Sequence, residues 1–125
     1  RSGDRFRVRA VQLMAGGLSI HAYDVSRGLP AAGLRVEVKG PDGKLLVVGL
    51  VDQHGVLDFA DVMATGLYEA TFHVGDWYRA QGVALPTPAF LESVPYRFGI
   101  ADLAQHYHLP FKMTPWGFSL CRGGA

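Results

Sequence analysis

Short runs in which apolar and polar residues alternate, separated by turns that contain Gly or Pro, restrict the fold of this chain more than any other feature. In Leu18–Asp24 the alternate residues Leu18, Ile20 and Ala22 are apolar, and Leu34–Lys39 repeats the pattern with Leu and Val. A period of two is typical of a β-strand with one buried face. The turn Gly40–Lys44 reads GPDGK, and Pro followed by Asp-Gly favours a hairpin. The sequence therefore predicts a fold built from short strands.

Other segments of similar length complete the predicted strand set: Leu45–Val51, Val56–Ala60, Leu67–His73, Ser93–Ala101 and the stretch from His108 onward. Because Leu45–Val51 is apolar throughout, it is predicted to be buried on both faces. Gly75–Gly82 lacks the alternation and is predicted to be the single helix, with Asp76 as its N-cap. The expected fold class is all-β, an antiparallel β-sandwich of seven or eight strands with one short helix.

The stretch His106–Gly123, HYHLPFKMTPWGFSLCRG, joins two histidines to a row of large apolar residues. Such a row would be costly to expose to water. It is therefore predicted to form a buried strand pair that ends at a functional site.

Length and composition indicate one domain. The chain has 125 residues, of which 49% are hydrophobic and 18% charged, so it can bury a core of its own. The first residues are polar and basic, and the glycine pair Gly16–Gly17 interrupts regular structure. These features predict an N-terminal arm over residues 1–17 and a folded domain over residues 18–125.

Charge and cysteine content exclude several classes of protein. Twelve Lys and Arg against eleven Asp and Glu, without a basic run, do not form the charge pattern of a nucleic-acid binder. The longest apolar windows are far shorter than the ~20 residues of a membrane helix. The single cysteine, Cys121, cannot form an intramolecular disulfide, and no Cys/His spacing indicates a zinc site. With no signal-peptide pattern, the chain is expected to be cytoplasmic and to bind no metal, nucleic acid or membrane.

Three stretches carry a resemblance to a known family. They are LSIHAYDVSRGLPAAGLRVEV, the turn VDQHG, and IADLAQHYHLPFKMTPWGFSLCRG. Over Leu18–Gly124 they resemble the successive signatures of the 5-hydroxyisourate hydrolases, the transthyretin-related proteins. The last family signature reads approximately HYHVPLLLSPYGYSTYRGS, and the chain matches it at HYH, Pro110, Pro115, Gly117, Ser119, Arg122 and Gly123.

The resemblance implies a transthyretin-like sandwich of two four-stranded sheets, assembled as a homotetramer whose active sites lie where two dimers meet. It also implies hydrolysis of an amide bond in the six-membered ring of 5-hydroxyisourate, a small-molecule substrate, without metal or organic cofactor. The functional groups of the family are a histidine in the first strand, an arginine in the third, the histidine before the proline of HYHVP, and the terminal tetrapeptide.

The two family histidines correspond to His21 and His108. An imidazole titrates near neutral pH, so one ring can take a proton from water while the other orients or protonates the leaving group. Which of the two is the base is left open. His106, His54 and His73 are interpreted as structural or solvated histidines, and Asp24 as a residue that forms a local turn.

The chain also departs from the family, which indicates a divergent member. Alignment on the DQHG turn places Leu50 where the family has its arginine, and the terminal tetrapeptide is Cys121, Arg122, Gly123 and Gly124 instead of Tyr-Arg-Gly-Ser. Leu50 and the four tail residues are the predicted substrate-binding positions. A guanidinium, a hydroxyl and an aromatic ring are lost, so the predicted site is less polar than in the family. Cys121 is interpreted as an apolar filler, with a nucleophilic role as the lesser alternative.

Three functions remain open. The two histidines can hydrolyse 5-hydroxyisourate or an N-methylated analogue, such as the trimethyl compound that methylxanthine breakdown would give, because methyl groups fit an apolar pocket. Alternatively, the chain is a non-catalytic, transthyretin-like binding protein for an apolar aromatic ligand. A purely structural sandwich is the third reading. The retention of both histidines favours the enzyme.

Overall fold

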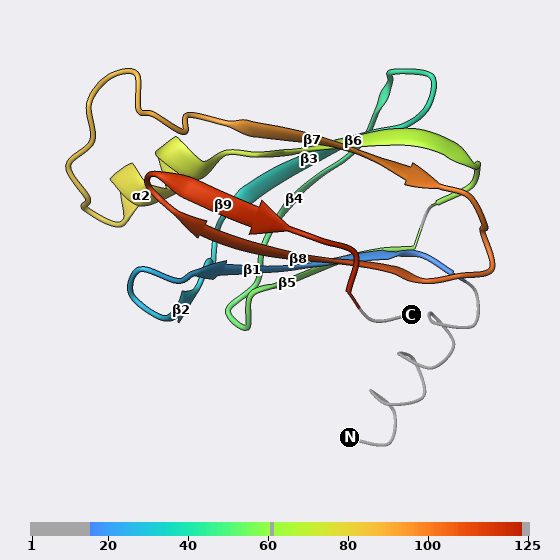
Figure 1. The fold of residues 1–125 in the computed structure, drawn as a ribbon, viewed down its shortest axis with the longest axis horizontal. Helices are drawn as coiled ribbons and strands as arrows, with labels where there is room; N and C mark the ends of the chain where they lie inside the picture. Colours follow the sequence, from blue (N-terminus) through green and yellow to red (C-terminus); the bar gives the residue numbers. More distant parts are fainter. Residues whose placement is uncertain (1–15, 61, 124–125) are drawn as a thin grey trace.

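Two β-sheets packed face to face make up the fold in the computed structural model, which describes residues 16–60 and 62–123 (Figure 1). Sheet A contains β1 (Leu18–Asp24), β2 (Leu29–Pro30), β5 (Val56–Phe59), β8 (Tyr107–Thr114) and β9 (Gly117–Leu120). Sheet B contains β3 (Arg35–Lys39), β4 (Leu45–Leu50), β6 (Gly66–Phe72) and β7 (Val94–Ile100). With the short helix α2 (Val74–Ala80), the described residues confirm the predicted all-β sandwich, although they form nine strands where seven or eight were predicted, and sheet A has five strands where four were expected. Residues 1–15 of the predicted arm lie outside the described residues.

The order of strands is β2-β1-β8-β9 in sheet A, where β5 pairs with the remaining length of β1, and β4-β3-β6-β7 in sheet B. One pairing departs from the expected antiparallel pattern, because β1 and β8 run parallel from Leu18↔Tyr107 to Asp24↔Met113. This pairing sets Ser19 beside His108. It therefore brings the beginning of the domain and its histidine-rich end together in one sheet.

The core lies between the sheets and is formed by the apolar residues that alternate along each strand. Phe72 of sheet B stacks on Phe111 of sheet A with ring centroids 3.9 Å apart, and both side chains are fully buried. Burial of a side chain of this size stabilises the fold by roughly 1.5–3 kcal/mol. Each strand of sheet A thereby has one face fixed against the core and the other turned outward.

Strand β4 is not buried on both faces, so that prediction is wrong. It is the edge strand of sheet B, and Leu45, Leu46, Val48 and Leu50 are all about half exposed or more. An edge strand pairs on one side only, and its outer face is left uncovered by the rest of the described chain. A continuous apolar run cannot distinguish this position from a central one, because both give the same hydrophobic pattern.

The helix begins earlier than predicted and without the predicted cap. His73 is the N-cap residue and makes no side-chain capping bond, while Asp76 lies in the first turn. The helix is held by packing instead: Trp77 and Tyr78 are buried, and Arg79 forms an ion pair with Glu92. The hydrogen bond from Arg79, followed by that from the backbone of Ala89, lowers the pKa of Glu92 to about 2.

Candidate functional site

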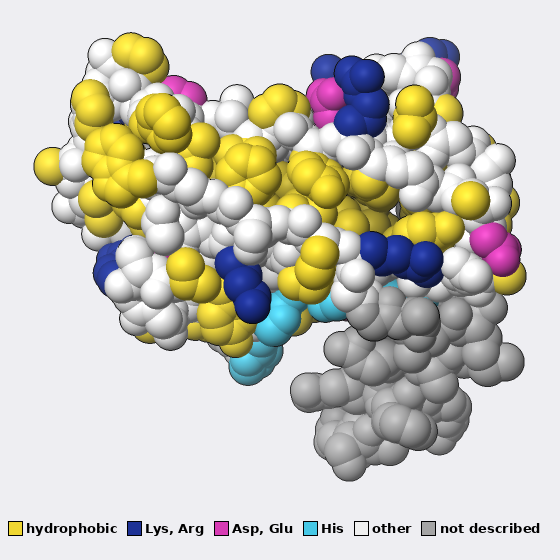
Figure 2. Space-filling model, viewed as in Figure 1, with side chains coloured by type: hydrophobic (Ala, Val, Ile, Leu, Met, Phe, Trp, Pro, Cys, Tyr) yellow, Lys and Arg dark blue, Asp and Glu magenta, His cyan; other side chains and the backbone are white. Residues whose placement is uncertain are grey.

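The outer face of sheet A carries the candidate site. Along each of its strands the residues between the core positions point outward, and register places them in adjacent rows. These residues are Ser19, His21 and Tyr23 from β1, Val56 and Asp58 from β5, His108, Pro110 and Lys112 from β8, and Ser119 from β9. Figure 2 shows histidine side chains gathered on the lower side of the molecule, the side on which β1 and β5 lie in Figure 1.

The structure brings the two predicted catalytic histidines together. Their ring centroids are 6.3 Å apart and their planes are inclined by 41°. The ring of Tyr23 meets His21 edge to face, with a centroid separation of 4.7 Å. Both histidines are partly exposed on the outer face of sheet A.

Ser19 links His108 to a third histidine. The Ser19 Oγ lies 2.6 Å from Nδ1 of His108 and 2.8 Å from Nε2 of His106. The other nitrogen of His106, Nδ1, lies 3.1 Å from the carbonyl oxygen of Gly16. His106, interpreted from sequence as structural, is therefore part of the polar network that contacts His108.

The DQHG turn packs against the His21 ring. The Asp52 carboxylate accepts backbone hydrogen bonds from Val56 at 2.9 Å and from His54 at 2.8 Å. The bond from Val56 is the largest cause of a lowered pKa of Asp52. Gly55 has φ +86°, and a Cβ there would lie 2.9 Å from the carbonyl oxygen of Ala22 and 3.1 Å from Cδ2 of His21. The turn thus requires glycine where it passes the His21 ring.

The C-terminal tail runs antiparallel beside β8 and forms a β-bridge with His108. The Gly123 N–H donates to the carbonyl oxygen of His108 at 2.8 Å, and Cys121, two residues earlier, is exposed. The Arg122 guanidinium stacks over the ring of Tyr107 at 4.0 Å and donates to Gln105 Oε1 at 3.1 Å. The structure thus brings Gly123 to His108 but directs the Arg122 charge to Tyr107, and Gly124 lies outside the described residues.

The structure places Leu50 on the other sheet, away from the histidines. It pairs with Arg35 in sheet B and is 62% exposed on the outer face of that sheet, whereas the histidines lie on the outer face of sheet A. The residue directly opposite His21 is Val56, in the β1–β5 pairing. Two apolar residues thus flank His21 on this face, Val56 in β5 and Pro110 in β8.

Val56, Ser19 and Lys112 were not among the site residues predicted from the sequence. The alternation in β1 already placed Ser19 on the face of His21, but nothing in the sequence showed that β8 would be the neighbour of β1. Lys112 lies opposite Tyr23 on one side and Ser119 on the other, so the face carries a cation.

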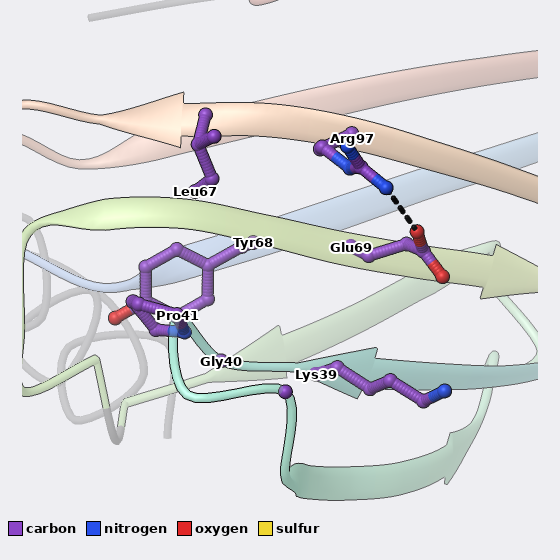
Figure 3. Close-up of a pocket in the computed structure, with 8 residues that line it drawn as sticks. Lys39, Gly40, Pro41, Leu67, Tyr68, Glu69 and Arg97 are labelled. Atoms are coloured by element: carbon purple, nitrogen blue, oxygen red, sulfur yellow. Dashed lines mark ion pairs between the residues drawn. The ribbon is translucent and has the colours of Figure 1, made fainter.

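A hollow of about 360 Å³ lies away from the histidines, on sheet B (Figure 3). Lys39, Glu69 and Arg97 contribute its charged groups, and Arg97 is 3.6 Å from the Glu69 carboxylate. The two cations are thus partly neutralised by a neighbouring acid. The hollow contains none of the residues of the sheet A face.

Within residues 16–60 and 62–123, no three His, Cys, Asp or Glu side chains are grouped so that they could hold a metal ion. In the same ranges, no helix has the length and hydropathy needed to cross a bilayer.

Comparison with known proteins matches this arrangement to one family. Residues 18–123 match the model of the HIUase/Transthyretin family. The chain is 43% identical over 118 residues to 5-hydroxyisourate hydrolase 2 of Rhizobium meliloti, covering 87% of this chain and 97% of that protein.

Two solved structures share the fold. The Klebsiella pneumoniae 5-hydroxyisourate hydrolase has a TM-score of 0.75 and 28% identity, covering 87% of this chain and 99% of that one. An (S)-allantoin synthase has a TM-score of 0.79 and 30% identity, with 87% of this chain covered, although the match spans only 44% of that longer chain. The sandwich, the histidine pair and the match over residues 18–123 lead to one conclusion: this chain belongs to the HIUase/Transthyretin family.

Proposed function

We propose that this protein hydrolyses the six-membered ring of 5-hydroxyisourate or of an N-methylated analogue. The observation that carries the proposal is the convergence of His21 and His108, from strands far apart in sequence, on one accessible face with ring centroids 6.3 Å apart. Relatives that share most of their length with this chain are named 5-hydroxyisourate hydrolases. A carrier function does not account for the paired imidazoles, so the binding-protein alternative is less favoured.

The separation of the two rings suits hydrolysis of a cyclic amide. One imidazole takes a proton from water as the water oxygen bonds to the ring carbonyl carbon. The C–N bond then breaks, and the departing ring nitrogen receives a proton from an imidazole. The single ring-opened product carries a new carboxylic acid and a new N–H at the two ends of the broken bond, so water is the only co-reactant consumed.

The residues beside the histidines influence which substrate the site accepts. Val56 presents an apolar side chain opposite His21. A substrate methyl group that packs against it would be removed from water without leaving a buried polar group unpaired. Lys112, on the same face, supplies a single compact charge and not the five-donor fork of an arginine. We therefore favour an N-methylated 5-hydroxyisourate as the better substrate.

We further propose that the protein is a homotetramer in which two copies bring their sheet A faces together. In one chain the face is open to solvent, with Lys112 and Asp58 exposed and the histidines only partly covered. A facing copy would exclude water from this surface and strengthen its electrostatic interactions.

A decay assay tests the enzymatic proposal. 5-Hydroxyisourate and its trimethyl analogue, generated enzymatically, are followed by absorbance with and without the protein. His21→Ala and His108→Ala are each expected to lose about two orders of magnitude in rate, the usual contribution of an acid-base group. His54→Ala, at an exposed turn, is the matched control and should retain wild-type activity. Wild-type protein that accelerates neither decay would refute the proposal.

A further inference from the structure

The Ser19 hydroxyl is almost fully buried and bridges two imidazoles. It lies 2.6 Å from Nδ1 of His108 and 2.8 Å from Nε2 of His106, and the serine is only 5% exposed. A hydroxyl has one proton to donate and can accept hydrogen bonds on its oxygen. It can therefore donate to only one of the two histidines and must accept from the other.

The backbone decides the direction of these bonds. The carbonyl oxygen of Gly16 can only accept, so His106 Nδ1, at 3.1 Å, carries a proton and donates it. In neutral His106 the lone pair is then on Nε2, which accepts from the Ser19 hydroxyl. Because the only proton of that hydroxyl is used, its oxygen accepts from Nδ1–H of His108. The proton of neutral His108 therefore resides on Nδ1 and its lone pair on Nε2.

We infer that Ser19 and His106 are positioning residues that hold His108 as the Nδ1–H tautomer, so that Nε2 is the basic atom presented to the reaction. The hydrogen bond at one ring nitrogen sets the chemistry of the other. A neutral histidine side chain in water favours the opposite tautomer, with the proton on Nε2. Without the bridge, His108 would thus have its proton on the atom that has to accept one.

This inference rests on the proposed function for its catalytic meaning, but its structural core can be measured without substrate. Long-range proton–nitrogen NMR of ¹⁵N-histidine-labelled protein distinguishes the two tautomers, at a pH high enough to keep the imidazoles neutral. Wild type is expected to show His108 protonated on Nδ1. Ser19→Ala should move the population toward Nε2–H, while Ser19→Thr, which retains the hydroxyl, should preserve the wild-type pattern.

Kinetics provide the second measurement. Ser19→Ala is expected to lower kcat about ten- to a hundredfold, part of the contribution of a general base, with KM changed by less than about threefold. Ser19→Thr should recover most of the rate. Ser93→Ala, an exposed serine in the loop before β7, is the matched control and should behave as wild type in both measurements.

Two results would overturn the inference: His108 protonated on Nε2 in the wild type, or a Ser19→Ala protein with unchanged tautomer and unchanged kcat. If Ser19→Ala does not fold, the wild-type and Ser19→Thr spectra still decide the tautomer. Wild-type protein that shows the Nδ1–H tautomer but hydrolyses neither substrate would refute the proposed function and support the positioning role.

Discussion

The backbone N–H of Gly123 donates a 2.8 Å hydrogen bond to the carbonyl oxygen of His108, so the C-terminal tail is fastened to the strand that carries a candidate catalytic residue. The approach is possible because residue 123 has no side chain. A Cβ there would lie 2.8 Å from Cγ of Pro110, a ring that cannot rotate away. The position of the tail relative to His108 therefore depends on a glycine.

Gly123→Ala is accordingly expected to displace the tail and lower kcat/KM by about tenfold, on the scale of losing one hydrogen-bonded positioning contact, with little change in melting temperature. Gly117→Ala is the matched control, because a Cβ at Gly117 meets nothing within 4 Å. Equal activity of the two variants in the decay assay would show that the tail contact has no role in the reaction.

Asp24 is expected to make the stability of the fold depend on acid pH. Burial alone would raise the pKa of this carboxyl, but hydrogen bonds from Ser26, Tyr78 and Arg27 outweigh burial and lower it. The carboxylate thus contributes stability that is fully present above its unfolded pKa of about 4 and is lost as pH falls toward the lower folded pKa. Melting temperature measured from pH 7 to pH 3 should fall at the acid end. Asp24→Asn should be less stable at pH 7 and show a flatter acid limb; an unchanged limb would contradict the assignment.

Tyr78→Phe tests the same network from the donor side. The Tyr78 hydroxyl donates to Asp24 Oδ1 at 2.7 Å, and burial, followed by this bond, raises the pKa of Tyr78 well above its usual range. Its removal is expected to cost about 1.5–3 kcal/mol in the free energy of unfolding, the range for a hydrogen bond to a charged group. Tyr68→Phe loses a bond to the neutral carbonyl of Ala64 and should cost less. Urea unfolding of both variants gives the comparison, and an equal or larger cost for Tyr68→Phe would contradict it.

Val56→Arg is expected to change substrate preference. A guanidinium opposite His21 would face the substrate methyl groups without a hydrogen-bond partner, so kcat/KM on trimethyl-5-hydroxyisourate should fall. On the unmethylated substrate one charge-assisted hydrogen bond, worth about 1.5–3 kcal/mol, would raise kcat/KM by ten- to a hundredfold. Leu50→Arg, on the outer face of sheet B, is the control and should leave both values unchanged. A wild type that prefers the unmethylated substrate would remove the basis for the apolar-pocket argument.

The expected mass in light scattering at micromolar concentration is roughly four times the 13.6 kDa of one chain. The physical reason is the open sheet A face, which a second copy would cover. A mass near that of one chain would exclude the tetramer and, with it, any contribution of a second subunit to the site.

Local sequence patterns predict most of the strands, the turns between them and the class of fold. Alternation in β1 and β8 identifies which residues face the core, because a period of two is a local property of the extended chain. The spacing of HYH also places His106 and His108 on the same face of a strand. These features require no knowledge of which strand lies beside which.

The tertiary structure decided which strands are neighbours, and therefore what each histidine contacts. The parallel pairing of β1 with β8 sets Ser19 between His106 and His108, and the pairing of β1 with β5 sets Val56, not Leu50, opposite His21. Strand pairing joins residues up to 89 positions apart, as in the Ser19–His108 contact, and no local pattern encodes such a choice. The exposed edge position of β4 could not be predicted from its sequence either, because burial of a strand depends on its neighbours as well as on its own residues.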